Sequence, residues 1–206
     1  MRIYELSDAS SFRGKFVYAY GYGPLATPMP FLHPAELARR QAFWEISKDP
    51  PGLLIEGGGS RWPDVLACGD PSPPYFVSQK IVDSLRREKI TLSSMTEMPI
   101  ATKKSKKLIE LPPKYFAVQA PLGIEVDFAA SNIPTDIAGS PILNPLPKPW
   151  PPILKLKASS WSGLDIFSWS NFRAGLGLDL LCTDRIVELA KREGWTNVRF
   201  DPIEAV

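Results

Sequence analysis

Histidine and cysteine are scarce in this chain. Its 206 residues include one histidine, His33, and two cysteines, Cys68 and Cys182. A structural zinc site takes four ligands, mostly cysteine and histidine at short spacings, and no CxxC or HxxxH spacing occurs. We therefore expect no metal and no cofactor, and free thiols rather than a disulfide.

Long apolar runs are also missing. No run reaches the roughly 18 apolar residues from which a membrane-spanning helix is built. The first residues, MRIYELSDASSF, carry acidic side chains where a signal peptide has its apolar stretch. We expect no membrane association and a cytoplasmic location.

Motifs for nucleotide binding and nucleophilic catalysis are absent as well. The glycine-rich EGGGSRWP stretch at 56–63 lacks the lysine and hydroxyl of a phosphate-binding loop and the GxGxxG spacing, so it is interpreted as a flexible loop. No GxSxG elbow occurs, and no pair of carboxylates accompanies the histidine. These absences favour a protein that is not an enzyme.

Charge is balanced overall and uneven along the chain. The 24 Lys and Arg residues against 22 Asp and Glu give a net charge of +2, too small to indicate nucleic-acid binding. Residues 73–115 carry nine basic and four acidic side chains, whereas residues 116–147 carry three acidic and no basic ones. The KKSKK run at 103–107 is typical of a solvated turn. We expect no nucleic-acid partner and an acidic surface over 116–147.

Proline is abundant, and 12 of its 22 residues lie in three clusters at 24–30, 70–74 and 140–152. Proline lacks an amide hydrogen and fixes φ, so these clusters are excluded from helix interiors and central strands. They predict long ordered loops. Trp150, in the third cluster, is either a lid over the core or an exposed contact residue.

The clearest pattern in the chain is an internal repeat. YFVSQKIVDSLRREKIT at 75–91 aligns with LLCTDRIVELAKREGWT at 180–196 at an offset of 105, and MPI at 98–100 aligns with DPI at 201–203 after a slip of two residues. Each copy has a short apolar run, a hydroxyl that can cap a helix, and then an amphipathic stretch. Two related units are therefore predicted.

The repeat predicts helices over 78–89 and 183–193, each followed by a strand. Gly194 is placed to end the second helix in the left-handed conformation. Lys89 holds the same position in the first copy, which predicts a less sharp end there.

The remaining pattern predicts the fold class. Further strands are expected at 15–20, 107–111, 114–120 and 123–128, and a helix at 34–46. Helices and strands do not alternate strictly, which favours an α+β fold with mainly antiparallel sheet and long proline-rich loops. We expect a single globular domain over 1–206, with two related halves, 1–110 and 111–206.

One stretch carries a family resemblance. DIFSWSNF at 165–172, followed by LLCTDRIVELAKREGWTNVRFDPI at 180–203, resembles the C-terminal half of the double-CxxCG motif proteins of myxobacteria. In that family an aromatic D-x-F-x-x-x-N-F segment precedes a TER(F) helix and a GVRF strand. The copy at 76–90 resembles the central segment of the same family and, more loosely, other bacterial immunity families. The paired CxxCG motifs are absent, since Cys68-Gly69 stands alone, so a zinc-binding role does not carry over.

The resemblance implies an immunity protein that binds a cognate secreted toxin and neutralises it by occlusion. Many such toxins are basic nucleases, and the acidic stretch suits a basic partner. Predicted partner contacts are Asp127, Asp136, Trp150 and Asp165. The alternative is an enzyme or small-ligand-binding protein with a site around Asp165, Ser170 and Asn171, which a deep polar pocket there would favour.

Overall fold

The structure is a computed structural model. It describes residues 2–8, 17–22, 52–58, 61–68, 75–98, 100–102, 112–142, 153–171 and 180–206. The predicted helix at 34–46, the predicted strand at 107–111 and Trp150 lie outside these residues. None of the helices in the described segments is long and apolar enough to cross a membrane.

Six strands form a closed barrel in the order β1-β12-β11-β9-β10-β13. Their bounds are β1 (Ile3–Asp8), β9 (Leu122–Val126), β10 (Lys155–Lys157), β11 (Ile166–Trp169), β12 (Leu180–Thr183) and β13 (Val198–Ala205). β9 runs parallel to β11 and β10 parallel to β13, while the other neighbours are antiparallel. One cluster of buried apolar side chains fills the interior: Ile3, Ile124, Val126, Ile133, Leu156, Phe167, Trp169 and Leu181.

Seven strands form a second sheet in the order β6-β8-β5-β4-β2-β3-β7. Their bounds are β2 (Val17–Tyr22), β3 (Gly52–Gly58), β4 (Val65–Cys68), β5 (Tyr75–Ser78), β6 (Ser94–Met98), β7 (Ile100–Thr102) and β8 (Tyr115–Gln119). β2 runs parallel to β4 and β3 parallel to β7, and the others are antiparallel. β6 and β7 are the strands at the two edges of this sheet, and only one residue separates them in the chain.

The two sheets repeat one pairing pattern, including its register. Met98 of β6 pairs with Tyr115 of β8, and Ile203 of β13 pairs with Ile3 of β1. Met98 and Ile203 are 105 residues apart, so the offset seen in the helices continues into these strands and the predicted slip of two residues is wrong. β1–β5 of the first half therefore correspond to β8–β12 of the second, and β6 and β7 together correspond to the single strand β13.

The first strands of the two halves are exchanged. β1 belongs to the first half of the chain but lies in the barrel, between β12 and β13. β8 belongs to the second half but lies in the other sheet, between β5 and β6. Each sheet is therefore completed by a strand from the other half of the chain.

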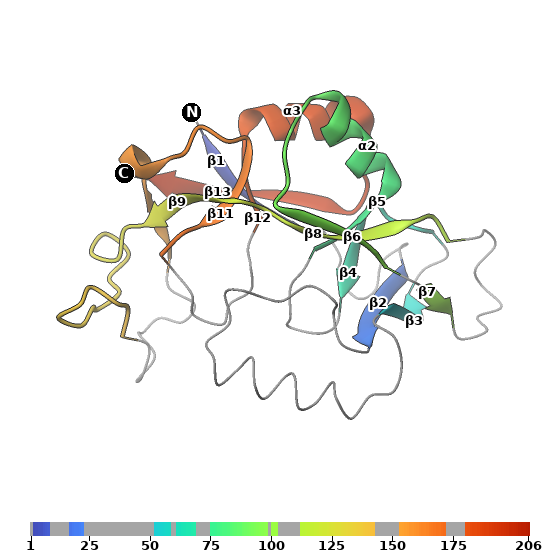
Figure 1. Cartoon of the computed structure of the whole chain (residues 1–206), viewed down its shortest axis with the longest axis horizontal. Helices are drawn as coiled ribbons and strands as arrows, with labels where there is room; N and C mark the ends of the chain where they lie inside the picture. The colour runs from blue at the N-terminus through green and yellow to red at the C-terminus, as the bar shows by residue number, and fades with distance from the viewer. Residues whose placement is uncertain are drawn as a thin grey trace.

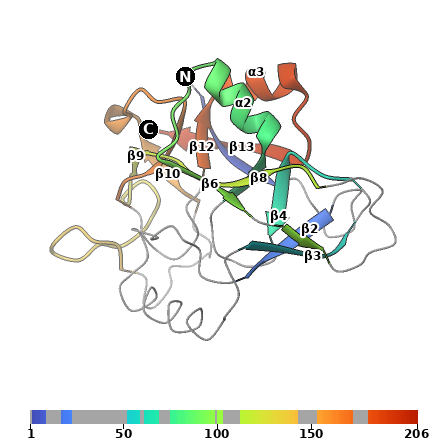
Figure 2. The same cartoon turned by 45° about the vertical axis from the view of Figure 1, so that its right-hand side comes forward.

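Both predicted repeat helices are confirmed, as α2 (Gln79–Arg87) and α3 (Asp184–Glu193). Each is followed by a strand, β6 or β13. The two helices lie side by side on one face of the molecule (Figures 1 and 2). Beneath them lies a shared core built from both halves, which includes Leu6, Val65, Ile81, Val82, Leu85, Val118, Ile166, Leu180, Ile186, Leu189 and Trp195.

The two helices also end alike. Lys89 and Gly194 both adopt the left-handed conformation, with φ of 57° and 60°. After each, a backbone amide returns to the last turn, from Ile90 to the Leu85 carbonyl and from Trp195 to the Ala190 carbonyl, both at 2.9 Å. The less sharp end predicted for the first helix is therefore wrong.

The predicted α+β class is wrong, because the described chain is dominated by strands that form a closed barrel and a second, matching sheet. Expected strands at 15–20, 114–120 and 123–128 coincide closely with β2, β8 and β9. Shorter strands such as β11 and β12 are buried at every position, so they lack the alternation of polar and apolar residues that marks a strand in a sequence. The expected loop at 56–63 also proves to begin within β3.

Candidate functional site

Asp165 lies at the start of β11 and is bound by two side chains. Its carboxylate accepts hydrogen bonds from Thr183 Oγ1 at 2.8 Å and from Arg185 Nη1 at 2.7 Å. The other half of the chain has the same arrangement before β4. There, Asp64 accepts from Ser78 Oγ at 2.7 Å and from Lys80 Nζ at 3.2 Å. A group that occurs in both halves with the same contacts is best explained by a structural role.

The basic members of these two groups join the halves. Lys80 Nζ donates to the carbonyl of Gly194, at the end of α3, at 2.8 Å, and Arg185 Nη2 donates to the carbonyl of Glu88, at the end of α2, at 3.1 Å. Hydrogen bonds from Arg185 lower the pKa of the Glu88 carboxyl, and Arg192 adds to this effect. Asp165 therefore positions an arginine that spans the two helices.

A reciprocal pair of ion pairs lies at the ends of the same helices. Arg87 of α2 bonds to Glu193 at 2.7 Å, and Arg192 of α3 bonds to Glu88. The members of the two pairs are again 105 residues apart. The surface of the helix pair thus has an approximate internal two-fold relation, which fits a joint between halves.

Ser170 and Asn171 are bound to the neighbouring strand. Ser170 Oγ donates to the Ile124 carbonyl at 3.2 Å. The Asn171 side chain accepts from the Val126 amide at 2.7 Å and donates to the Val126 carbonyl at 2.9 Å. These contacts extend the pairing of β11 with β9 beyond the end of the strand. The polar atoms that the alternative site needs are therefore engaged by the backbone.

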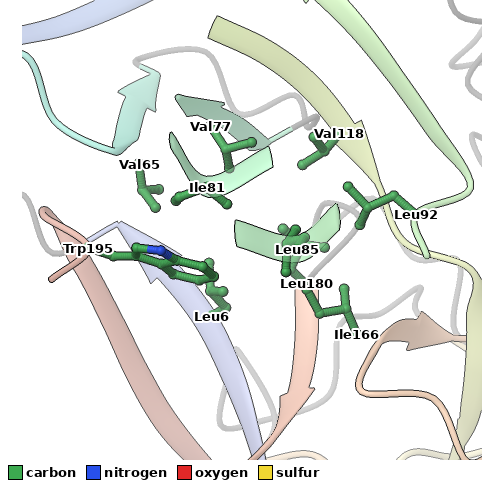
Figure 3. Close-up of a pocket in the computed structure, with 10 residues that line it drawn as sticks. All are labelled: Leu6, Val65, Val77, Ile81, Leu85, Leu92, Val118, Ile166, Leu180 and Trp195. Carbon is green, nitrogen blue, oxygen red and sulfur yellow. The ribbon is translucent and has the colours of Figure 1, made fainter. Parts of the chain in front are cut away.

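A small cavity lies in the shared core between the two halves (Figure 3). Its volume is about 20 Å³, which is close to the space needed by one water molecule. All ten side chains that line it are apolar or aromatic: Leu6, Val65, Val77, Ile81, Leu85, Leu92, Val118, Ile166, Leu180 and Trp195. Asp165, Ser170 and Asn171 do not line it, so this cavity is not the polar pocket that the alternative requires.

The described residues offer neither a metal-binding group nor a reactive thiol. Among these residues, no group of three or more His, Cys, Asp or Glu side chains could hold a metal ion. Cys182 is a free and buried thiol, and burial, with a smaller effect of Asp184, raises its pKa to about 12. A thiol in this state stays protonated at neutral pH and is a poor nucleophile. His33 and the Cys68 side chain lie outside the description.

Asp127 lies at the base of the segment 127–142, which connects β9 toward β10. Its Oδ1 accepts from the Ala130 amide at 2.8 Å, and its own amide donates to the Lys155 carbonyl at 2.8 Å. Ser131 Oγ accepts from the Lys155 amide at 2.8 Å, and Ile133 is buried in the barrel interior. The base of this segment is thus fixed to the barrel.

Asp136 shapes the far end of the same segment, residues 134–142, which we call the tip hairpin. Its Oδ1 accepts from the amides of Ala138 and Ser140 at 2.8 and 2.9 Å, and its own amide donates to the Ser140 carbonyl at 2.9 Å. Gly139 supplies the positive φ of 77° that this turn requires. The Ile142 amide closes the hairpin on the Pro134 carbonyl at 2.7 Å.

Ile137 is the functional candidate that sequence reasoning missed. It lies at the turn of the tip hairpin, and its exposed fraction is 110% of the reference value for isoleucine. The segment, yellow at the left of Figure 1, extends away from the strands. The available signal was a lone isoleucine within TDIAGS (135–140), among residues that favour turns.

The chain matches no protein-family model and no curated protein. The resemblance to the double-CxxCG proteins therefore rests on the residue pattern alone. Of the predicted contact residues, Asp127 lies at the base and Asp136 at the far end of the segment 127–142, whereas Asp165 belongs to the helix joint. The segment 127–142 is the candidate site.

Proposed function

We propose that this protein is a cytoplasmic immunity protein that binds a cognate secreted toxin and neutralises it by occlusion. The observation that supports this function best is the segment 127–142, which is anchored in the barrel through Ile133 and ends in an internally hydrogen-bonded, exposed hairpin. A loop that is ordered before binding loses little conformational entropy when a complex forms. Such a loop is suited to tight inhibition.

The charge around this segment favours a basic partner. Residues 116–147 contain Glu125, Asp127 and Asp136 and no Lys or Arg. Glu125 is paired with Lys157 at 3.3 Å, so the two aspartates dominate the charge of the segment itself. A surface of one sign speeds encounter with a partner of the opposite sign. A basic toxin, such as a nuclease, fits this surface.

The alternative of an enzyme or small-ligand site gains nothing from the contacts of Asp165, Ser170 and Asn171. Each of these side chains bonds to the backbone or to a partner that recurs in the other half of the chain. We therefore do not propose a second function.

Genetic protection tests the proposal. The probe is the C-terminal toxin domain of a large secreted protein encoded directly upstream of this chain, co-expressed with the full chain in a bacterial host. We expect growth to be restored and a complex with nanomolar or lower Kd, which corresponds to about 12 kcal/mol or more. Cell death despite folded, abundant chain, or an upstream gene without a toxin domain, would contradict the proposal.

A further inference from the structure

We infer that Ile137 is the anchor of the toxin interface, and that it enters an apolar pocket on the toxin that is rimmed by basic side chains. The inference rests on the proposed function and names the chemistry of its contact. It assigns different tasks to two adjacent residues of the tip hairpin. Ile137 provides the buried contact, and Asp136 shapes the turn and contributes charge at a distance.

The exposure of Ile137 sets it apart. Its side chain is completely solvent-accessible, and Ile142 at the end of the same hairpin is 38% exposed. A single exposed aliphatic residue is common on protein surfaces. Here, however, the residue lies at the outermost turn of a projecting segment, where a pocket on another protein can reach it from several sides.

The hairpin holds Ile137 in place before binding. Residues on both sides of Ile137 are tied together, because Asp136 bonds to the amides of Ala138 and Ser140 and to the Ser140 carbonyl. A β-bridge between Thr135 and Pro141 closes the turn. An apolar anchor on a fixed turn gains buried area without ordering the backbone, which is typical of residues that dominate an interface.

Asp136 is poorly placed to act as the direct anchor. One of its carboxylate oxygens already accepts two backbone hydrogen bonds within the turn. Its charge still acts through solvent, because the residue is exposed. Long-range attraction of this kind acts on the association rate more than on the lifetime of the complex. Basic side chains around the toxin pocket would supply the opposite charge.

Three variants of the full chain separate these tasks. Binding to the upstream-encoded toxin domain is measured by stopped-flow association and surface-plasmon dissociation, at low and high salt. Ile137→Asp should raise Kd by about 30-fold or more, mainly through faster dissociation. Asp136→Asn keeps the oxygen that accepts the turn's hydrogen bonds, so it should slow association and reduce its salt dependence while dissociation changes little.

The matched control is Ile153→Asp. Ile153 is 76% exposed but lies outside the tip hairpin, so this variant should bind within about threefold of the parent. Circular dichroism and urea unfolding check that all variants stay folded. If the parent binds and Ile137→Asp binds equally well, or Ile153→Asp loses as much affinity, the inference is wrong while the proposed function stands. If the parent itself does not bind, the proposed function fails.

Discussion

At the scale of single residues, the partly buried carboxyl of Glu5 should make the stability of the protein depend on pH. Burial raises the pKa of its carboxyl, and Asp201, which lies opposite in the β1–β13 pair, raises it further. The folded protein therefore holds this proton more tightly than the unfolded chain does. The contribution of Glu5 to the free energy of unfolding is fully present below the pKa that its carboxyl has in the unfolded chain. This contribution is lost as pH rises through the higher pKa of the folded protein.

Glu5→Gln removes the titration and should make the protein more stable at pH 7. The gain should shrink as pH falls toward 4, where Glu5 takes up its proton in the parent. Urea unfolding at both pH values measures the difference. Glu188→Gln, an exposed change on α3, is the control and should have little effect at either pH. A gain that is equal at pH 4 and pH 7 would show that the carboxyl charge is not its cause.

The two equivalent aspartates should differ in their contribution to stability. Asp64 is 8% exposed, and besides Ser78 and Lys80 it accepts from the amide and hydroxyl of Thr196 at 2.9 and 3.0 Å. Asp64→Ala removes the buried acceptor of all these hydrogen bonds, leaves the buried Ser78 hydroxyl without it, and should cost about 2–4 kcal/mol. Asp165→Ala removes two partners at a more exposed position and should cost about 1–2 kcal/mol. Urea unfolding of both variants tests the order, and the reverse order would contradict the assignment of Asp64 as the better-bound copy.

At the scale of elements, the two helix ends make opposite predictions. Lys89 adopts the left-handed conformation that glycine takes without strain, so Lys89→Gly should stabilise the protein by about 0.5–1 kcal/mol. Gly194→Ala should destabilise it by about 1 kcal/mol. A β-carbon at Gly194 would meet nothing within 4 Å, so the cost is conformational rather than a clash. Thermal unfolding of the two single variants gives both signs, and a loss of stability in Lys89→Gly would contradict the equivalence of the two ends.

The sequence predicted the elements whose residues repeat with a helical period. Ile81 and Leu85 of α2, and Ile186 and Leu189 of α3, mark one face each, and all four are buried under the helices as expected. The strands β11 and β12 could not be found this way, because they are short and buried on both faces. β12 also depends on pairing with β1, at the other end of the chain.

The candidate site was predictable only in part. Asp127 and Asp136 were chosen because their segment lacks basic residues, but their hydrogen bonds to nearby amides carry no signal in charge composition. Asp165 was predicted as a partner contact and as a member of the alternative site. Its structural role becomes visible only beside Asp64, which lies 101 rather than 105 residues away and so falls outside the aligned repeat.

At the scale of the whole molecule, the exchanged first strands join the two halves into one unit. β1 pairs with β12 and β13 along its length, while β8 pairs with β5 and β6. The helices that cover these strands share one core with side chains from both halves. Neither sheet can be complete while the other half is unfolded, so the protein should unfold in one cooperative step.

A core change on β1 should therefore weaken both sheets equally. Leu6 is 4% exposed and lies in the shared core, so Leu6→Ala should cost about 2–5 kcal/mol. Hydrogen exchange measured by mass spectrometry should show the same loss of protection in β5 and β8, which lie in the sheet without Leu6, as in β11 and β12. Leu122→Ala, at a position 39% exposed on β9, is the control and should change protection by less than about 0.5 kcal/mol. If Leu6→Ala lowers protection in the barrel alone, the halves unfold separately, and the exchange of strands does not couple them.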